Sequence, residues 1–218
     1  MSTNQKFSRH TYSYKELRKA VGWIGILLPF TLMIGNSFIF NEEVFQESIS
    51  HYYYTGMGDV FVGALCAVAL FMFFYSGYDS RDDWAGHLAG VFAIGVAWFP
   101  VTETGTATGA GIIHLICAGL FFFILAVFSL FLFTLKEENP STQKSKRNNV
   151  YVICGLIILT CMLAIATFHG FFRDDNPNSR FVFVAETIAL VAFGTSWLTK
   201  GGDFLFPDEP RASTKENN

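Results

Sequence analysis

The sequence has few charged residues for its length. Only 15% of its 218 residues are Asp, Glu, Lys or Arg, whereas about 25% are charged in an average soluble domain. Long apolar runs occupy most of the chain and leave no room for a large soluble domain. The formal net charge of −3 gives no indication of a nucleic-acid partner, and we expect none. These features indicate a protein whose main partners are membrane lipids.

Cysteine is also scarce, with only four in the chain. All four lie inside apolar runs, and none is paired with another at the spacing of metal ligands. We therefore interpret them as small apolar residues in helix packing, not as disulfides or zinc ligands. They are Cys66, Cys117, Cys154 and Cys161.

Six stretches are apolar and close to the length of about 20 residues that a spanning helix needs. In lipid the backbone must satisfy its own hydrogen bonds, so each stretch is expected to be a helix. The chain is therefore predicted to be all-α, a polytopic integral membrane bundle of six transmembrane helices. The first stretch is interpreted as a retained signal anchor, because it is too long for the apolar core of a cleaved signal peptide. The predicted spans are residues 20–40, 56–78, 84–101, 110–135, 150–172 and 181–199.

The Lys and Arg residues lie almost entirely on one side of the predicted spans. Of the 15 in the chain, 13 fall on the side of the two termini, and only Arg173 and Arg180 lie opposite. Basic residues are enriched on the cytoplasmic side of membrane proteins. Residues 1–19 and 201–218 are therefore predicted to be cytoplasmic tails that flank a transmembrane domain of residues 20–200. We expect a multi-pass protein of the inner (cell) membrane.

Ionisable residues within the predicted spans gather toward the opposite, outward side. A charged side chain costs about 2.5–3.5 kcal/mol at the membrane centre, so it is expected to face the bundle or a wet cavity. Glu186 is the deepest of them, roughly 9 Å into the sixth span at about 1.5 Å per residue. The polar stretch before the second span lies at a similar level. An outward pocket is predicted here, with the candidate ligand-binding residues Ser48, Ser50, His51, Asp59, His114 and Glu186.

The second span begins with Asp59, and its surroundings allow two interpretations. One helical face is shared by Asp59, Gly63, Cys66 and Ala67. Small residues let helices approach each other, which predicts that Asp59 faces the bundle. Alternatively, Asp59 caps its helix, because the partial charge of a helix N-terminus favours an anion. The preceding triplet Tyr52-Tyr53-Tyr54 likewise fits an interfacial aromatic belt or a lid folded over the helix ends.

Several short motifs of the chain resemble a known group of membrane proteins. Ser48-Ile49-Ser50 follows the first span, and Gly58-Asp59-Val60-Phe61-Val62-Gly63 opens the second. The fourth span carries His114, Ala118 and Phe122. Over roughly residues 18–200, the chain resembles six-span bacterial membrane proteins of a domain-of-unknown-function family, similar in layout to the Frag/DRAM/Sfk group. The resemblance implies a multi-helix membrane protein, and some relatives in the wider group are linked to lipid or anchor remodelling.

A more distant resemblance is to seven-helix hydrolases that include alkaline ceramidases and adiponectin-receptor-like proteins. Those enzymes use a Ser, an Asp and three His to hold zinc near one membrane face. The similar residues here are Ser48 or Ser50, His51, Asp59 and His114. The chain departs from that pattern, because six spans are predicted and Glu186 stands where the last helix of those hydrolases carries two His. On this interpretation zinc is the candidate ion, and its candidate ligands are His51, Asp59, His114, His169 and Glu186.

Three functions follow from these residues, and they leave open whether the chain is an enzyme. The favoured function is a membrane protein whose outward pocket binds a lipid headgroup or a small polar ligand. The second is a metal-assisted intramembrane hydrolase acting on a lipid, in which the metal brings the pKa of a bound water toward neutrality. The third is a small proton-coupled transporter, in which an intramembrane acid relays protons. Pro29 marks the place where such a transporter would break its first helix.

Overall fold

The computed structural model describes residues 3–75, 80–103, 107–134, 141–173, 176, 179–202 and 204–206, with the backbone alone for residues 3–14. The described part is helical and contains no strand, which confirms the all-α prediction. Its α-helices are α1 (Thr3–Phe38), α2 (Gly58–Phe73), α3 (Ser80–Trp98), α4 (Gly109–Val127), α5 (Thr142–Phe171) and α6 (Phe181–Gly201). A 3-10 helix, η1 (Ile49–Tyr54), precedes α2, and a π-helical segment, η2 (Phe128–Leu132), continues α4.

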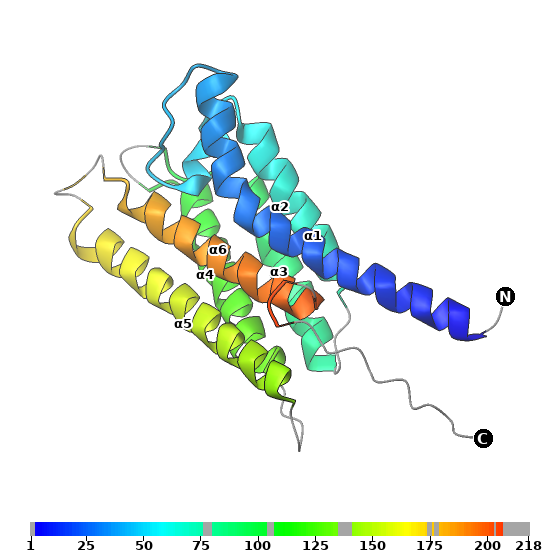
Figure 1. Cartoon of the computed structure of the whole chain (residues 1–218). Helices are drawn as coiled ribbons and strands as arrows, with labels where there is room; N and C mark the ends of the chain where they lie inside the picture. Colours follow the sequence, from blue (N-terminus) through cyan, green and yellow to red (C-terminus); the bar gives the residue numbers. More distant parts are fainter. Residues whose placement is uncertain are drawn as a thin grey trace, which may run out of the picture.

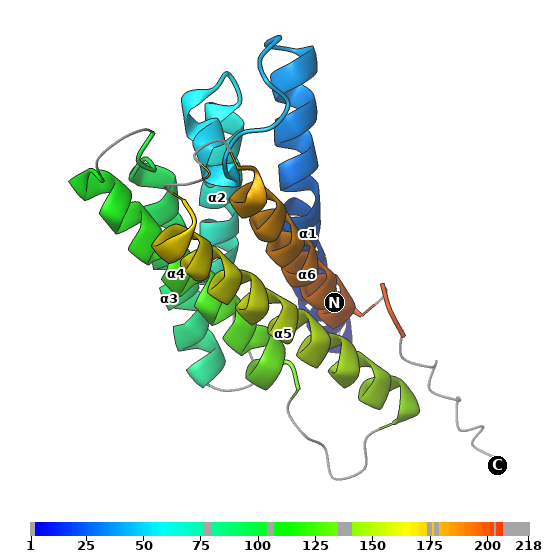
Figure 2. The same cartoon turned by 90° about the vertical axis from the view of Figure 1, so that its left-hand side faces the viewer.

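The α-helices form a closed ring (Figures 1 and 2). Around it, α1 packs on α6, α6 on α5, α5 on α4, α4 on α3, α3 on α2, and α2 returns to α1. The first and last helices are therefore neighbours, and they run antiparallel (Figure 1). Their backbones approach closely where Gly194 of α6 faces Gly22 and Ile26 of α1. Glycine permits this approach because it has no side chain to keep the helices apart.

Four helices of the described part are long and apolar enough to cross a membrane. They are Lys15–Phe38, Gly109–Leu132, Thr142–Phe171 and Phe181–Gly201. The predicted second and third spans do not meet the same standard. α2 is apolar but has only 16 residues, or about 24 Å of helix, against roughly 30 Å of hydrocarbon. α3 carries Arg81, Asp82 and Asp83 in its first turn. Residues 76–78, the end of the predicted second span, lie outside the described residues.

Several helices extend beyond the predicted spans. The backbone of α1 is already helical at Thr3, although residues 1–19 were expected to be a tail. α5 begins at Thr142, eight residues before the predicted span 150–172. The reason is a helix cap, because the Ser141 hydroxyl accepts a hydrogen bond of 3.2 Å from the Lys144 N–H. Residues 207–218, most of the predicted C-terminal tail, lie outside the described residues.

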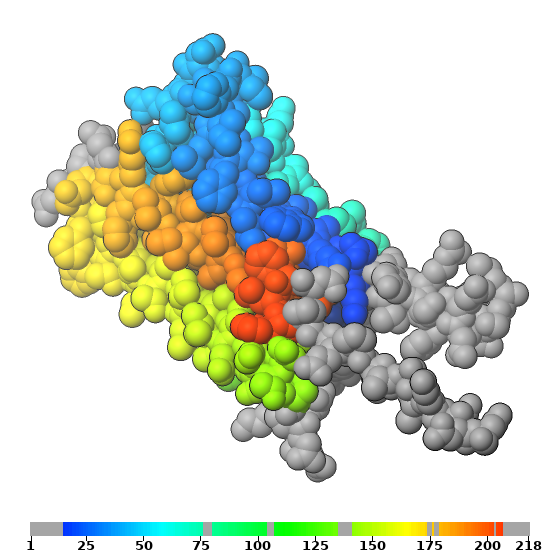
Figure 3. Space-filling model, viewed as in Figure 1, coloured from blue at the N-terminus to red at the C-terminus, as the bar shows by residue number. Residues whose placement is uncertain are grey.

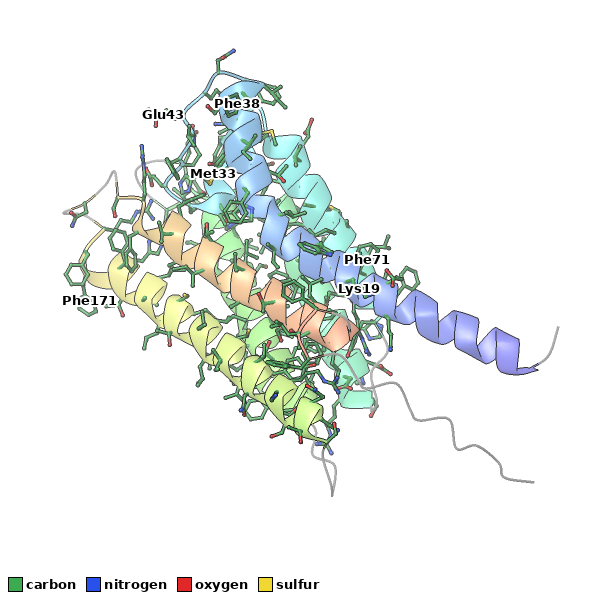
Figure 4. All side chains as sticks on the ribbon, viewed as in Figure 1. Lys19, Met33, Phe38, Glu43, Phe71 and Phe171 are labelled. Atoms are coloured by element: carbon green, nitrogen blue, oxygen red, sulfur yellow. The ribbon has the colours of Figure 1, made fainter. Side chains whose placement is uncertain are left out.

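The two ends of the bundle differ in packing. Trp197, near the last turn of α6, is fully buried among the rings of Tyr75, Phe128 and Phe133, whose centroids lie 5.3–5.5 Å from its own. Figure 4 shows Lys19 near this densely packed end and Phe38 and Glu43 at the other. η1 lies at the end with Phe38 and Glu43, where buried polar residues such as Ser48 and Ser50 lie beside the aromatic pair Tyr52 and Phe183. Figure 3 shows the segment that leads to η1 lying over the start of α6.

Candidate functional site

The 3-10 helix η1 is built by local hydrogen bonds of Ser48. Ser48 is its N-cap, and the Ser48 hydroxyl accepts a hydrogen bond of 3.3 Å from the His51 N–H. The same hydroxyl lies 2.6 Å from Nδ1 of the His51 ring. A hydroxyl has one proton and two lone pairs, so Ser48 can accept from the His51 N–H and also donate its proton to Nδ1. With Nδ1 as the acceptor, the neutral ring of His51 carries its proton on Nε2.

Hydrogen bonds and ring packing hold η1 and the residues before it against the first turns of α6. The Ile49 N–H donates a hydrogen bond of 2.6 Å to Oε2 of Glu186, and the Phe183 N–H donates one of 3.0 Å to the Glu47 carbonyl. Tyr52 is fully buried against Phe183, and its hydroxyl donates to the Val44 carbonyl. Tyr52, the first ring of the tyrosine triplet, therefore packs over the start of α6. Tyr53 is half-buried, and Tyr54 is exposed, with its hydroxyl 2.6 Å from the Val101 carbonyl.

A cavity of about 190 Å³ lies beneath η1, between α4, α5 and α6. It is lined by most of the polar residues singled out in the sequence. These are Ser48, Ser50, His51, His114, His169 and Glu186. Apolar side chains of α4 and α5 complete the walls, among them Ile112, Leu115, Ile165 and Phe168. The cavity thus combines a hydrogen-bonding surface with a hydrocarbon-like one.

His114 is held in one orientation by the end of α3. Its Nδ1 lies 2.7 Å from the Phe99 carbonyl oxygen, and the side chain is only 3% exposed. A carbonyl oxygen can only accept a hydrogen bond, so Nδ1 carries the proton of the neutral ring. Nε2 is then a hydrogen-bond acceptor. His51 and His114 therefore offer opposite hydrogen-bonding characters to the same cavity.

Two charged residues of the cavity were not among the predicted site residues. Glu47 and Arg173 both line it, and one Glu47 carboxylate oxygen lies 3.7 Å from His51 Nε2 and 4.0 Å from an Arg173 nitrogen. Burial, followed by the charge of Arg173, lowers the pKa of His51 to about 4, so its ring is neutral at pH 7. One sequence signal could have identified Arg173, because it is one of only two basic residues opposite the other 13.

Asp59 lies elsewhere, although the sequence placed it with His114 and Glu186. It is exposed and lines a separate hollow beside Tyr53 and Trp98. α2 turns Phe61 into the core, and Asp59 stands two residues earlier, about 200° around the helix. Gly63, expected on a packed face, has open space around it. The position of Asp59 in the first turn of α2 agrees with the capping interpretation instead.

The candidate metal ligands do not assemble. Among the described residues, no group of three or more His, Cys, Asp or Glu side chains is arranged to hold a metal ion. Nδ1 of each histidine has another partner: Ser48 for His51, the Phe99 carbonyl for His114, and Arg173 at 3.3 Å for His169, which leaves only the Nε2 atoms for a metal. Asp59 is also outside the cavity. The donor set therefore does not fit the zinc site that the distant resemblance implied.

Replacing Glu186 tests how firmly η1 is fastened. Glu186→Leu removes the acceptor of the buried Ile49 N–H, and leaving a buried donor unsatisfied costs about 1–3 kcal/mol. We expect hydrogen–deuterium exchange in residues 47–54 to become roughly ten- to a hundredfold faster. Glu186→Gln, which keeps a carbonyl oxygen, should stay close to the wild type. Unchanged protection in the Leu variant would show that this bond does not hold η1 in place.

The comparisons with known proteins place the chain in a family without assigning it an activity. No curated protein and no solved structure matches it. One family matches residues 27–201, a stretch that begins within α1 and ends at the last residue of α6. It therefore contains η1 and every helix that lines the cavity. The chain belongs to DUF7103, a family of unknown function.

Proposed function

We propose that this chain is a membrane protein whose cavity beneath η1 binds the headgroup of a membrane lipid or a small polar ligand of similar size. The observation that carries the proposal is the pairing of a polar wall with an apolar one in a single cavity. Its volume of about 190 Å³ is below the roughly 300–1,000 Å³ of pockets for drug-sized ligands. That size suits a headgroup better than a whole lipid.

A second, smaller hollow supports a lipid in particular. It measures about 40 Å³ and is lined mainly by apolar side chains, including Phe61, Leu65 and Phe121. Ser50, Ala118 and Glu186 line both hollows. A polar chamber that adjoins an apolar one matches a ligand with a polar and an apolar part.

The placement in the membrane is part of the same proposal. We infer six spans with α2 and α3 included, since both helices belong to the closed ring and α2 is apolar after Asp59. The distribution of 13 basic residues against two supports cytoplasmic termini, with the cavity on the outer side of the inner (cell) membrane. A six-span layout of this kind is also the basis of the likeness to the Frag/DRAM/Sfk group.

The alternative functions have less support. The metal-assisted hydrolase needs a ligand group, and the described candidates do not form one. The proton-coupled transporter would favour a broken helix at Pro29, but α1 is continuous from Thr3 to Phe38. Binding therefore remains the function that the geometry supports best.

Filling the boundary between the two hollows tests the proposal. Ala118→Phe places a ring where both hollows meet, so we expect native mass spectrometry to show at least a tenfold loss of co-purified lipid. The matched control is Gly119→Phe, one position along α4, where a side chain meets open space. Asp59→Asn, in the separate hollow, should also keep the ligand. Equal lipid occupancy in Ala118→Phe and the wild type would place the ligand outside this cavity.

A further inference from the structure

Glu47 lies between two hydrogen-bond donors without satisfying either. Its carboxylate oxygen is 3.7 Å from His51 Nε2 and 4.0 Å from the Arg173 guanidinium. Both separations exceed the 2.7–3.2 Å of ordinary N–H···O hydrogen bonds. Within the described part of the chain, His51 Nε2 is buried and makes no hydrogen bond of ordinary length, although the Thr102 backbone lies close enough to raise the pKa of the ring. A buried N–H without a well-formed hydrogen bond is costly, and a ligand oxygen would supply a better acceptor.

The same side of the cavity concentrates groups that attract an anion. Arg173 lies 3.3 Å from His169 Nδ1, and its positive charge is the next cause after burial that lowers the pKa of His51. Among the described residues that line the cavity, the acids are Glu47, which is partly exposed, and Glu186, which is already bonded to the Ile49 N–H. A planar guanidinium beside N–H donors is well suited to the oxygens of a phosphate.

We propose that this side of the cavity is a subsite for a phosphate ester, formed by Arg173 and His51, with Glu47 as the carboxylate that the phosphate displaces. The inference rests on the proposed function, because it names the chemistry of the ligand in the same cavity. An incoming phosphate oxygen accepts from His51 Nε2 and from the guanidinium. His114 Nε2 and the free oxygen of Glu186 then face the remainder of the ligand, where they accept from hydroxyl or amino groups.

Two sources of phosphate ester fit this chemistry: a phospholipid headgroup and a water-soluble phosphate ester. The test is a titration of the full-length, detergent-solubilised chain by microscale thermophoresis with three probes. Dioctanoyl phosphatidic acid and dioctanoylglycerol differ only in the phosphate, and glycerol 3-phosphate lacks the acyl chains. We expect phosphatidic acid to bind at least tenfold more tightly than dioctanoylglycerol. Glycerol 3-phosphate binding as tightly as phosphatidic acid would support the subsite and assign it to a soluble ligand.

Two variants should change phosphatidic acid binding in opposite directions. Arg173→Gln removes the charged donor, and we expect affinity to fall about tenfold, the equivalent of one charge-assisted hydrogen bond. Glu47→Gln removes the competing carboxylate, and affinity should rise several-fold. A gain of affinity cannot come from misfolding, so this variant remains informative if Arg173→Gln is unstable. Arg173→Lys should fall between Arg173→Gln and the wild type, and Asp59→Asn should match the wild type.

The outcomes separate this inference from the proposed function. If dioctanoylglycerol binds as tightly as phosphatidic acid, the phosphate subsite is overturned while lipid binding stands. Unchanged phosphatidic acid affinity in both Arg173→Gln and Glu47→Gln would likewise overturn the subsite. Lipid occupancy in Ala118→Phe, measured independently by native mass spectrometry, decides the proposed function.

Discussion

Gly194→Leu is expected to force α6 away from α1 and to lower the stability of the whole bundle. A side chain at this position would overlap the Gly22 carbonyl oxygen and the Ile26 side chain. Backbone atoms cannot move aside as a flexible side chain can, so the helices themselves must separate. Overpacking typically costs about 1–3 kcal/mol, and we expect this variant at or above the upper end. That corresponds to a fall of roughly 10 °C in the thermal unfolding midpoint.

The measurement is thermal unfolding of the purified chain in detergent, followed by intrinsic fluorescence. Gly63→Ala is the matched control, because Gly63 lies in a helix but has no neighbouring atom within 4 Å of an added Cβ. Alanine has the higher helix propensity by about 1 kcal/mol, so the control should unfold at the same temperature or slightly higher. Equal midpoints for Gly194→Leu and Gly63→Ala would contradict the close α1–α6 contact.

Trp197→Ala is expected to lower stability by about 3–5 kcal/mol, because it empties the centre of the aromatic cluster. Trp197 is 1% exposed and contacts the rings of Tyr75, Phe128 and Phe133. Among the described residues, its Nε1 has no hydrogen-bond partner. The loss is therefore one of packing and not of a hydrogen bond, and Trp197→Phe should recover most of the stability. Chemical or thermal unfolding of the three proteins measures the difference.

Trp98→Ala provides the comparison for this variant. Trp98 is 68% exposed at the end of α3, so its removal leaves no internal cavity. We expect its unfolding midpoint to stay within a few degrees of the wild type. If Trp197→Ala and Trp98→Ala lowered the midpoint equally, the aromatic cluster would not be a main source of stability.

The helical layout was predictable from the sequence because it depends on local properties. Long apolar runs favour helices in lipid, and each of the six predicted apolar stretches contains a described helix. Helix ends were less predictable, because they depend on single side chains such as the Ser141 cap that starts α5 early. The end of α2 is a second example. Apolar residues continue past its last residue, Phe73, so the sequence pattern does not predict where this helix ends.

The cavity was predictable only in part. Estimated depth grouped His114, His169 and Glu186 with the stretch that contains Ser48 and His51, and all of these residues line one cavity. Depth says nothing of rotation about a helix axis, and the small-residue stripe beside Asp59 indicated the wrong face of α2.

The partners within the cavity needed the fold itself. Glu186 was expected to meet other polar side chains, yet its partner is the backbone N–H of Ile49, a group that every residue except proline carries. Glu47 and Arg173 lie on connecting segments whose path has no periodic signal in the sequence. The contact between Glu47 and Arg173 therefore could not be predicted from the spacing of residues in the sequence.

The bond between Ile49 and Glu186 has a consequence for how the protein is made. The two residues are 137 positions apart, so η1 leaves the ribosome long before its acceptor exists. At about 5–20 residues per second, the interval lasts roughly 7–27 s. During this time α1 also lacks α6, its main neighbour in the ring. The cavity therefore lacks its α6 wall until the final helix is synthesised, and packing of that helix completes the ring and the cavity together.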